Sequence, residues 1–281
     1  MSEADPLAPF DPLESGAPPE RVNYATGVLL DAQDFIDEQT YHRGRLAAAL
    51  KAVGGFGTLS GLRVVPPAAA DGELELTVQP GVALDRFGRL LQVDVPQCIR
   101  LARWFEATGT QQLRTAMPDD TAVVVDVFLS SADCARGKTP AFANGPFDAL
   151  DAVAPSRLAE SARLELVLRA EADAPKPKNF WPAASTNAET KLQAVLGSWE
   201  AAPAKTDAGF DRLGEHVAGH DTSAVLLARV KVPVKAGAGA DGRPALDMTR
   251  RVSADNSLRP FIFVPGKWLG QAFDATPLVQ P

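Results

Sequence analysis

The chain has few of the residues that most often build metal sites and nucleophilic active sites. Its 281 residues include two cysteines and three histidines. The cysteines, Cys98 and Cys134, are too far apart for the short spacing of a zinc-ligand pair. Two separate buried thiols are favoured over a disulfide, although the sequence leaves open whether the two cysteines pair. Metal-dependent and thiol-dependent catalysis are therefore weak hypotheses for this chain.

Long apolar runs and an excess of positive charge are also missing. No stretch approaches the roughly 20 continuous apolar residues of a membrane-spanning helix, so we expect no membrane span. The net charge of −7 argues against binding to nucleic acid or to an anionic membrane, because both need a basic surface. The first residues, MSEADPLAPFDPLES, are acidic and rich in proline, whereas a signal peptide begins with basic residues and an apolar run. We expect a protein made in the cytoplasm without a signal peptide.

The strongest local signal is an amphipathic helix over residues 31–53. Asp31 is the expected N-cap, and acidic residues follow it, which suits the unpaired N–H groups of the first turns. Gly54 and Gly55 are expected to end the helix. An apolar stripe at roughly helical period runs along it, formed by Phe35, Ile36, Leu46, Leu50 and Val53 with Gln39 among them. We interpret this helix as a docking element, either for its own sheet or for a neighbouring subunit.

Strand patterns dominate the chain after this helix. Following a turn bracketed by Gly57 and Gly61, the first strand is expected at residues 62–65. Alternating polar and apolar residues predict a strand over 73–78, and the run VQPGVALDRFGRLLQV, residues 78–93, is expected to form a hairpin.

The most apolar run, residues 121–129, is predicted to lie at the centre of the sheet with residues 163–169 as its partner. The stretch 130–160 between them is too long for a simple hairpin and is interpreted as an interaction loop. Further along, short helices are expected at 188–199 and 207–217, and strands at 223–232 and 261–263.

Four parts are predicted along the chain. These are an extended arm over residues 1–22, a docking helix with a β domain over 23–170, a linker with short helices over 171–222, and C-terminal strands with a tail over 223–281. Because strands outnumber helices and are mostly adjacent in sequence, we expect a mainly β fold, an antiparallel sandwich or open barrel, with the N-terminal amphipathic helix making the class α+β overall.

A family resemblance rests on the first third of the chain. The pattern Asn23-Tyr24-x-Thr26-Gly27-x-Leu29-Leu30-x-x-x-Asp34-Phe35-x-x-Glu38-Gln39-x-Tyr41-His42-Arg43, followed by Gly55-Phe56-Gly57-x-x-x-Gly61-Leu62, resembles the N-terminal signature of proteins encoded with phage tails and contractile injection systems. Its first half is distantly similar to the N-terminal shell segment of type VI secretion baseplate subunits. A hairpin of the form PG-x-A-x-D-x-x-G extends the resemblance to about residue 95.

The resemblance implies a structural subunit that acts at the baseplate or at the attachment of fibres. It implies other particle subunits as partners, self-association as a trimer or dimer, and a particle that is released or extracellular after assembly. It brings no catalytic, cofactor or metal residues with it. The residues expected to take part in the interaction are apolar or aromatic: Tyr24, Leu29, Leu30, Phe35, Tyr41, Phe56, Trp181, Phe261 and Trp268.

The sequence offers weaker support for other chemistries. His216, His220 and Asp221 have the spacing of a helical zinc site, but Gly219 lies between the histidines and the general-base glutamate is missing, so a solvated helix end is favoured. No Gly-x-Ser-x-Gly motif is present, and the Gly54–Gly57 run lacks the lysine of a phosphate loop. A receptor- or carbohydrate-binding module is the second hypothesis, and a glycan hydrolase is the third.

Overall fold

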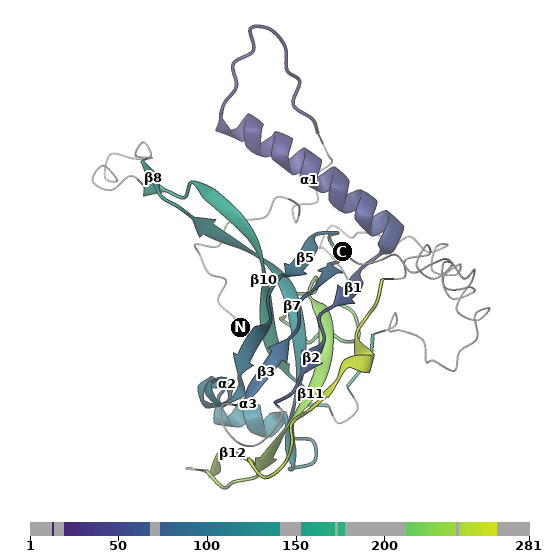
Figure 1. Ribbon diagram of the computed structural model, residues 1–281, viewed down its shortest axis with the longest axis vertical. Coiled ribbons are helices and arrows are strands. Elements are labelled where there is room, and N and C mark those ends of the chain that lie inside the picture. The colour runs from purple at the N-terminus through teal and green to yellow at the C-terminus, as the bar shows by residue number, and fades with distance from the viewer. Residues whose placement is uncertain are drawn as a thin grey trace, which may run out of the picture.

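A computed structural model describes residues 13, 20–67, 74–140, 153–171, 174–177, 212–239 and 242–262. The described chain is mainly β with an N-terminal helix, of α+β class, as the strand patterns predict. Figure 1 shows an elongated molecule in which the long helix α1 and the tip of a two-stranded ribbon, marked by β8, project from one end of a β body.

The elements follow one another in a simple order. The helices are α1 (Ala32–Gly54), α2 (Leu101–Ala107), α3 (Thr110–Thr115) and the short 3-10 helix η3 (Asn256–Leu258). The strands are β1 (Gly57–Gly61), β2 (Val64–Val65), β3 (Glu75–Val78), β4 (Gly81–Leu84), β5 (Leu90–Val93), β6 (Gln97–Arg100), β7 (Ala122–Arg136), β8 (Thr139–Pro140), β9 (Val153–Ala154), β10 (Arg157–Leu168), β11 (Val225–Lys235), β12 (Ala245–Leu246) and β13 (Ser253–Asp255).

The strands form antiparallel sheets, part of which curls into a half-barrel. The largest sheet has the order β10-β7-β11-β12, with β13 also paired to β11. Two three-stranded sheets, β1-β4-β5 and β2-β3-β6, lie beside it, and β5 packs against both β7 and β10. As expected from its apolar run, β7 is central: nine successive residues, from Ala122 to Ser130, are buried.

One continuous core joins these sheets. It contains valines and leucines of β7 and β11, the inward residues of β2 to β5, and Leu101, Phe105 and Leu113 of the two short helices. A buried ion pair lies within the large sheet, where Asp126 on β7 meets Arg169 at 2.9 Å and Arg229 at 2.7 Å. The guanidinium groups neutralise a carboxylate that is fully buried.

Several sequence predictions need correction. The turn expected between Gly57 and Gly61 is strand β1, because these glycines let the neighbouring backbone approach closely. A Cβ on Gly61 would overlap the carbonyl oxygen of Pro80.

Residues 130–160 are not one long loop, since β7 and β10 continue as a paired ribbon that aligns Arg136 with Arg157. Its polar exposed residues hide the strand pattern. Residues 141–152 lie outside the described residues.

The C-terminal half also differs from expectation. The described part of the helix expected at 207–217 forms turns, while the helix expected at 188–199 lies outside the described residues. Of the aromatic strand expected at 261–263, the structure describes Phe261, which forms an isolated parallel bridge with Thr58, and Ile262, while Phe263 lies outside the described residues. The strand expected at 223–232 is confirmed as β11, and that at 163–169 as β10. Helices α2 and α3 were not predicted from the sequence.

Candidate functional site: an exposed helix and the segment before it

Helix α1 begins where the sequence predicts. The Asp31 side chain accepts hydrogen bonds from the backbone N–H groups of Gln33 and Asp34, and the Asp34 carboxylate accepts from the Asp31 N–H at 2.8 Å. This reciprocal capping box fixes the start of the helix. At the other end Gly55 takes a φ of 73°, a conformation that favours glycine, and stops it.

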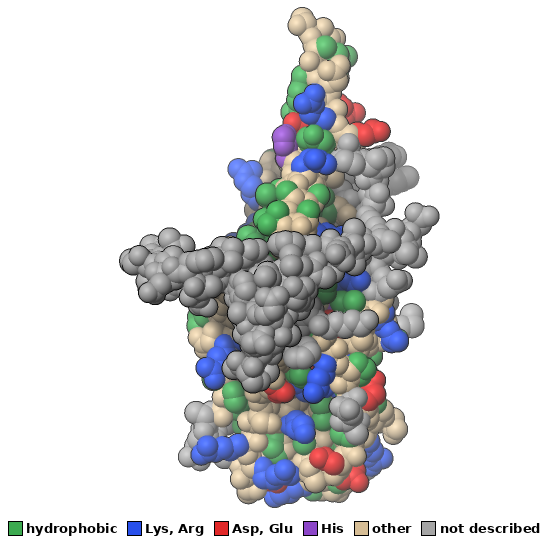
Figure 2. Space-filling view, turned by 90° about the vertical axis from the view of Figure 1, so that its right-hand side faces the viewer, with side chains coloured by type: hydrophobic (Ala, Val, Ile, Leu, Met, Phe, Trp, Pro, Cys, Tyr) green, Lys and Arg blue, Asp and Glu red, His purple; other side chains and the backbone are tan. Residues whose placement is uncertain are grey.

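The helix and the segment before it expose an unusual amount of apolar surface. Leu29 is 94% exposed, Val53 77% and Leu46 62%. Tyr24, Val28, Phe35 and Ile36 are also exposed, whereas Ala47 is the buried side chain of α1. Figure 2 shows apolar side chains gathered along the projecting upper part of the molecule, interspersed with charged ones. We call the segment Glu20–Asp31 the tip segment.

The base of α1 is seated firmly on the β body. The Cα of Gly88, in the β4–β5 turn, lies so close to the helix that a Cβ there would overlap the carbonyl oxygen of Ala47. A Cβ on Gly54 would lie 3.0 Å from Cγ2 of Ile262. On its flank, Arg43 Nε lies 3.6 Å from Glu160 of the ribbon. The body thus holds one end of a helix whose remaining surface is largely exposed.

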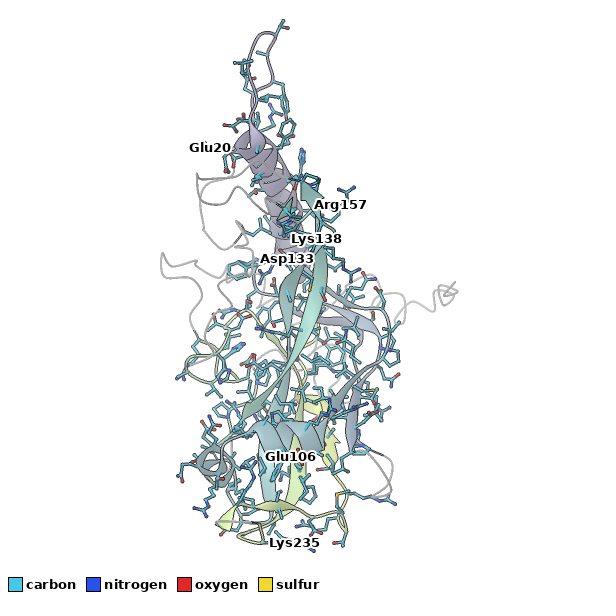
Figure 3. All side chains as sticks on the ribbon, turned by 90° about the vertical axis from the view of Figure 1, so that its left-hand side faces the viewer. Glu20, Glu106, Asp133, Lys138, Arg157 and Lys235 are labelled. Atoms are coloured by element: carbon cyan, nitrogen blue, oxygen red, sulfur yellow. The ribbon has the colours of Figure 1, made fainter. Side chains whose placement is uncertain are left out.

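The β7–β10 ribbon lies at the same end of the molecule as α1. In Figure 3 Asp133, Lys138 and Arg157 lie at the end that carries α1, and Glu106 and Lys235 lie toward the opposite end. Leu158 and Val153, near the ribbon tip, are more than half exposed. Exposed apolar residues therefore concentrate at one end of the structure.

The predicted interaction residues fall into three groups. Tyr24, Leu29, Leu30 and Phe35 are exposed, all on the tip segment or the first turn of α1. Tyr41, Phe56 and Phe261 are half-buried, and the Arg259 guanidinium lies 5.1 Å from the centre of the Phe261 ring. Trp181 and Trp268 lie outside the described residues. Leu46 and Val53, farther along α1, are also exposed, although the choice of interaction residues from the sequence left them out.

The histidine cluster does not form the helix end expected from the sequence. His216 is buried in a turn, stacks on Phe128 with ring centres 5.4 Å apart, and has Nε2 2.9 Å from the carbonyl oxygen of Ala224. Burial lowers the pKa of His216 below its ordinary value of 6.5. His220 instead pairs with Glu165 at 3.4 Å, and Asp221 accepts from Ser223. The three side chains are thus engaged separately.

The cysteines also differ from expectation. Cys98 on β6 and Cys134 on the ribbon are both exposed, although the sequence pointed to buried thiols. Both are unpaired, as favoured. The burial prediction is wrong because β6 is an outer strand of its sheet and the Cys134 stretch of β7 projects beyond the body.

A cavity of about 450 Å³ opens beside α2 and α3. Trp104, Gln111, Gln112 and Thr115 line it from the helices, and His220 closes another side. Leu166 and Leu168 add aliphatic surface, and an indole ring and aliphatic groups beside amide and hydroxyl groups suit a polar ligand with apolar faces. It lies away from the tip segment.

Fold and surface together define a mainly β protein that presents, at one end, a long helix with exposed apolar side chains. No protein-family model matches the chain, and no curated protein matches it. Among solved structures it is similar to the crystal structure of TssK, with a TM-score of 0.31 and 14% sequence identity over 82% of this chain and 41% of that one. The chain thus spans less than half the length of TssK, a type VI secretion baseplate component. A TM-score this low defines neither a shared fold nor a function.

In the part of the chain that the structure describes, no helix is long and apolar enough to cross a membrane.

Proposed function

We propose that this protein is a structural, non-enzymatic subunit of a phage-tail-like contractile particle. It acts in the assembly of the baseplate or in the attachment of fibres, by docking to other subunits inside the cytoplasm before the particle is released. The observation that carries the proposal is the exposed apolar surface of α1 and the tip segment, held at one end of a packed β body.

The exposure of these residues favours a partner. Exposed apolar side chains gathered on one surface usually mark an interaction site. Tyr24, Leu29, Leu30 and Phe35 belong to the sequence pattern that resembles tail-associated proteins, and all four are exposed instead of packed in the core. Their role in the pattern is therefore better explained by contact with another subunit than by the stability of this chain.

The test replaces Leu29, the most exposed of these residues, in the full chain. Leu29→Asp should leave the unfolding free energy within about 0.5 kcal/mol of the parent, since surface substitutions cost little. It should reduce incorporation into purified particles at least tenfold, because a buried carboxylate would face the partner. Val95→Asp is the matched control, because Val95 is also exposed, at 65%, but lies in the β5–β6 turn. Equal incorporation of both variants would remove the proposal.

The cavity beside α2 and α3 favours a second candidate function. Its single aromatic ring, Trp104, with the amides of Gln111 and Gln112, fits the receptor- or carbohydrate-binding module. Under this alternative Gln111→Ala, which leaves the apolar packing of Trp104 intact, should abolish cell attachment by assembled particles while incorporation stays normal. Unchanged attachment would dismiss this candidate.

A further inference from the structure

One face of α1 carries exposed side chains at alternating intervals of four and three residues. Along it lie Phe35, Gln39, His42, Leu46, Ala49 and Val53, and all six are exposed. Another face of the helix, which carries Gly44 and Ala47, turns toward Leu13 and the β4–β5 turn. The four-and-three spacing is the a and d pattern of a coiled-coil seam. We call these six residues the seam.

The charges of α1 indicate the direction in which a second helix would lie. Acidic side chains occupy the N-terminal half between Asp31 and Glu38, and Arg43, Arg45 and Lys51 occupy the C-terminal half. Two such helices placed in opposite directions set each acidic half against a basic half, whereas parallel helices set like charges side by side. The helix dipoles add to the preference for opposite directions.

We propose that the seam of α1 packs against the same seam of a second copy of this chain, in antiparallel orientation. Phe35 faces the partner's Leu46, and Gln39 faces the partner's His42. The second copy is one of the docking partners that the proposed function requires, so this pairing rests on that function and makes it specific.

The register follows from pairing apolar with apolar and polar with polar residues over the first four seam positions, Phe35 to Leu46, while Ala49 and Val53 face the partner's Ala32 and Val28. In this register Phe35 and Leu46 form an apolar layer, while Gln39 and His42 form a polar one at the centre. Beside the seam, Glu38 lies next to the partner's Arg45, and the pair occurs twice by symmetry. Oε1 of Glu38 lies 2.9 Å from His42 Nε2 in the single chain, so the Glu38 side chain has to turn outward to meet the guanidinium of the partner's Arg45.

A shift by one heptad is less favourable. Phe35 would then face the partner's Val53, but Leu46 would face the partner's His42 and bury an imidazole against an apolar side chain. The two copies of Arg45 would also meet near the symmetry axis, where like charges repel. Polar positions within a seam commonly specify register in this way.

Cysteine cross-linking tests both partner and register in the purified full-length chain. Cys98→Ser and Cys134→Ser first remove the exposed native thiols. Phe35→Cys and Leu46→Cys are then introduced into separate chains that carry tags of different size. Mild oxidation of the co-expressed chains should give disulfide-linked heterodimers, while each chain alone should give none. Cross-linking of each chain with itself would show parallel helices, and cross-linking of Phe35→Cys with Val53→Cys would show the shifted register. Either result overturns the proposal, as does an absence of cross-links with a monomeric mass in solution.

Charge exchange supplies a second readout that replaces none of the six seam residues, although Glu38→Arg also removes the contact between Glu38 and His42. Glu38→Arg should raise the dimer dissociation constant about tenfold, because two surface ion pairs become repulsive. The double variant Glu38→Arg/Arg45→Glu should restore it to within about threefold, since both pairs re-form with reversed sign. Asp37→Arg, an equal charge change at an exposed neighbouring position away from the seam, is the control and should have little effect. Failure of the double variant to recover would contradict the assigned register.

These measurements need no particle, so the two proposals fail separately. A monomeric chain whose Leu29→Asp variant is lost from particles removes the self-pairing and leaves the assembly role standing. If the chain forms the cross-linked antiparallel dimer but its Leu29→Asp variant enters particles normally, the self-pairing stands and the assembly role is removed.

Discussion

Gly88 sets how closely α1 can approach the body, and its replacement by alanine tests whether this contact holds the helix. Gly88 lies in the β4–β5 turn with a φ of 91°, and a Cβ there would overlap the carbonyl oxygen of Ala47. Gly237, in the turn between β11 and β12, also has a positive φ, of 61°, but nothing lies within 4 Å of its Cβ position. The two glycines therefore separate backbone strain from loss of the helix contact.

The expected costs follow from this difference. Gly237→Ala should lower the unfolding free energy only through its left-handed backbone, by about 1 to 2 kcal/mol. Gly88→Ala has the same backbone strain and also displaces the base of α1. This displacement exposes the buried Ala47 methyl group, which costs about 0.8 kcal/mol, and disturbs the packing around it. We expect a total loss of about 2 to 4 kcal/mol for Gly88→Ala.

Urea denaturation measures the two losses, and amide hydrogen exchange locates them. In Gly88→Ala the amides of the C-terminal half of α1 should exchange faster, because the helix no longer rests on the hairpin. In Gly237→Ala their exchange should match that of the parent protein. Equal losses in both variants, with unchanged exchange in α1, would refute the claim that this contact seats the helix.

Two further predictions concern the body. Asp126→Asn should lower the unfolding free energy by about 3 kcal/mol or more, because it leaves Arg169 and Arg229 without their shared carboxylate. The control, Asp133→Asn on the projecting part of the same strand, should lower it by less than about 0.5 kcal/mol. Similar losses in the two variants would contradict a stabilising role for the buried ion pair. Burial lowers the pKa of His216 below 6.5, so the unfolded chain binds more protons and stability should fall as the pH drops below 6.5. Urea denaturation between about pH 5 and 8 should show that His216→Gln removes this pH dependence of the unfolding free energy. An unchanged pH dependence in the variant would show that another group causes it.

Local signals in the sequence predicted the elements whose cause is local. Asp31 with Asp34 marks the start of α1, Gly55 marks its end, and the apolar run of β7 marks a central strand. Each depends on side chains within a few residues of one another, which a sequence displays directly. Tyr24, Leu29 and Leu30 of the tip segment could be proposed as interaction residues because they belong to the sequence pattern that resembles tail-associated proteins.

Features that depend on distant neighbours were missed. The glycines of β1 suggested a turn because nothing in the sequence shows that Pro80 packs against Gly61. The ribbon looked like a loop because both of its faces are exposed, which removes the alternation that marks a half-buried strand. The apolar stripe predicted for α1 shares Phe35, Gln39, Leu46 and Val53 with the seam, but the sequence does not show that these residues stay exposed, because exposure depends on which face of the helix the body covers.

The central claim is that the tip segment and α1 become covered by partners in an assembled particle. Hydroxyl-radical footprinting of the chain, free in solution and within purified particles, measures this directly. We expect oxidation of Tyr24, Leu29 and Phe35 to fall several-fold in the particle, while oxidation of Val95 and Leu90, which are also exposed, stays the same. Equal oxidation of Tyr24, Leu29 and Phe35 in both states would contradict the docking role.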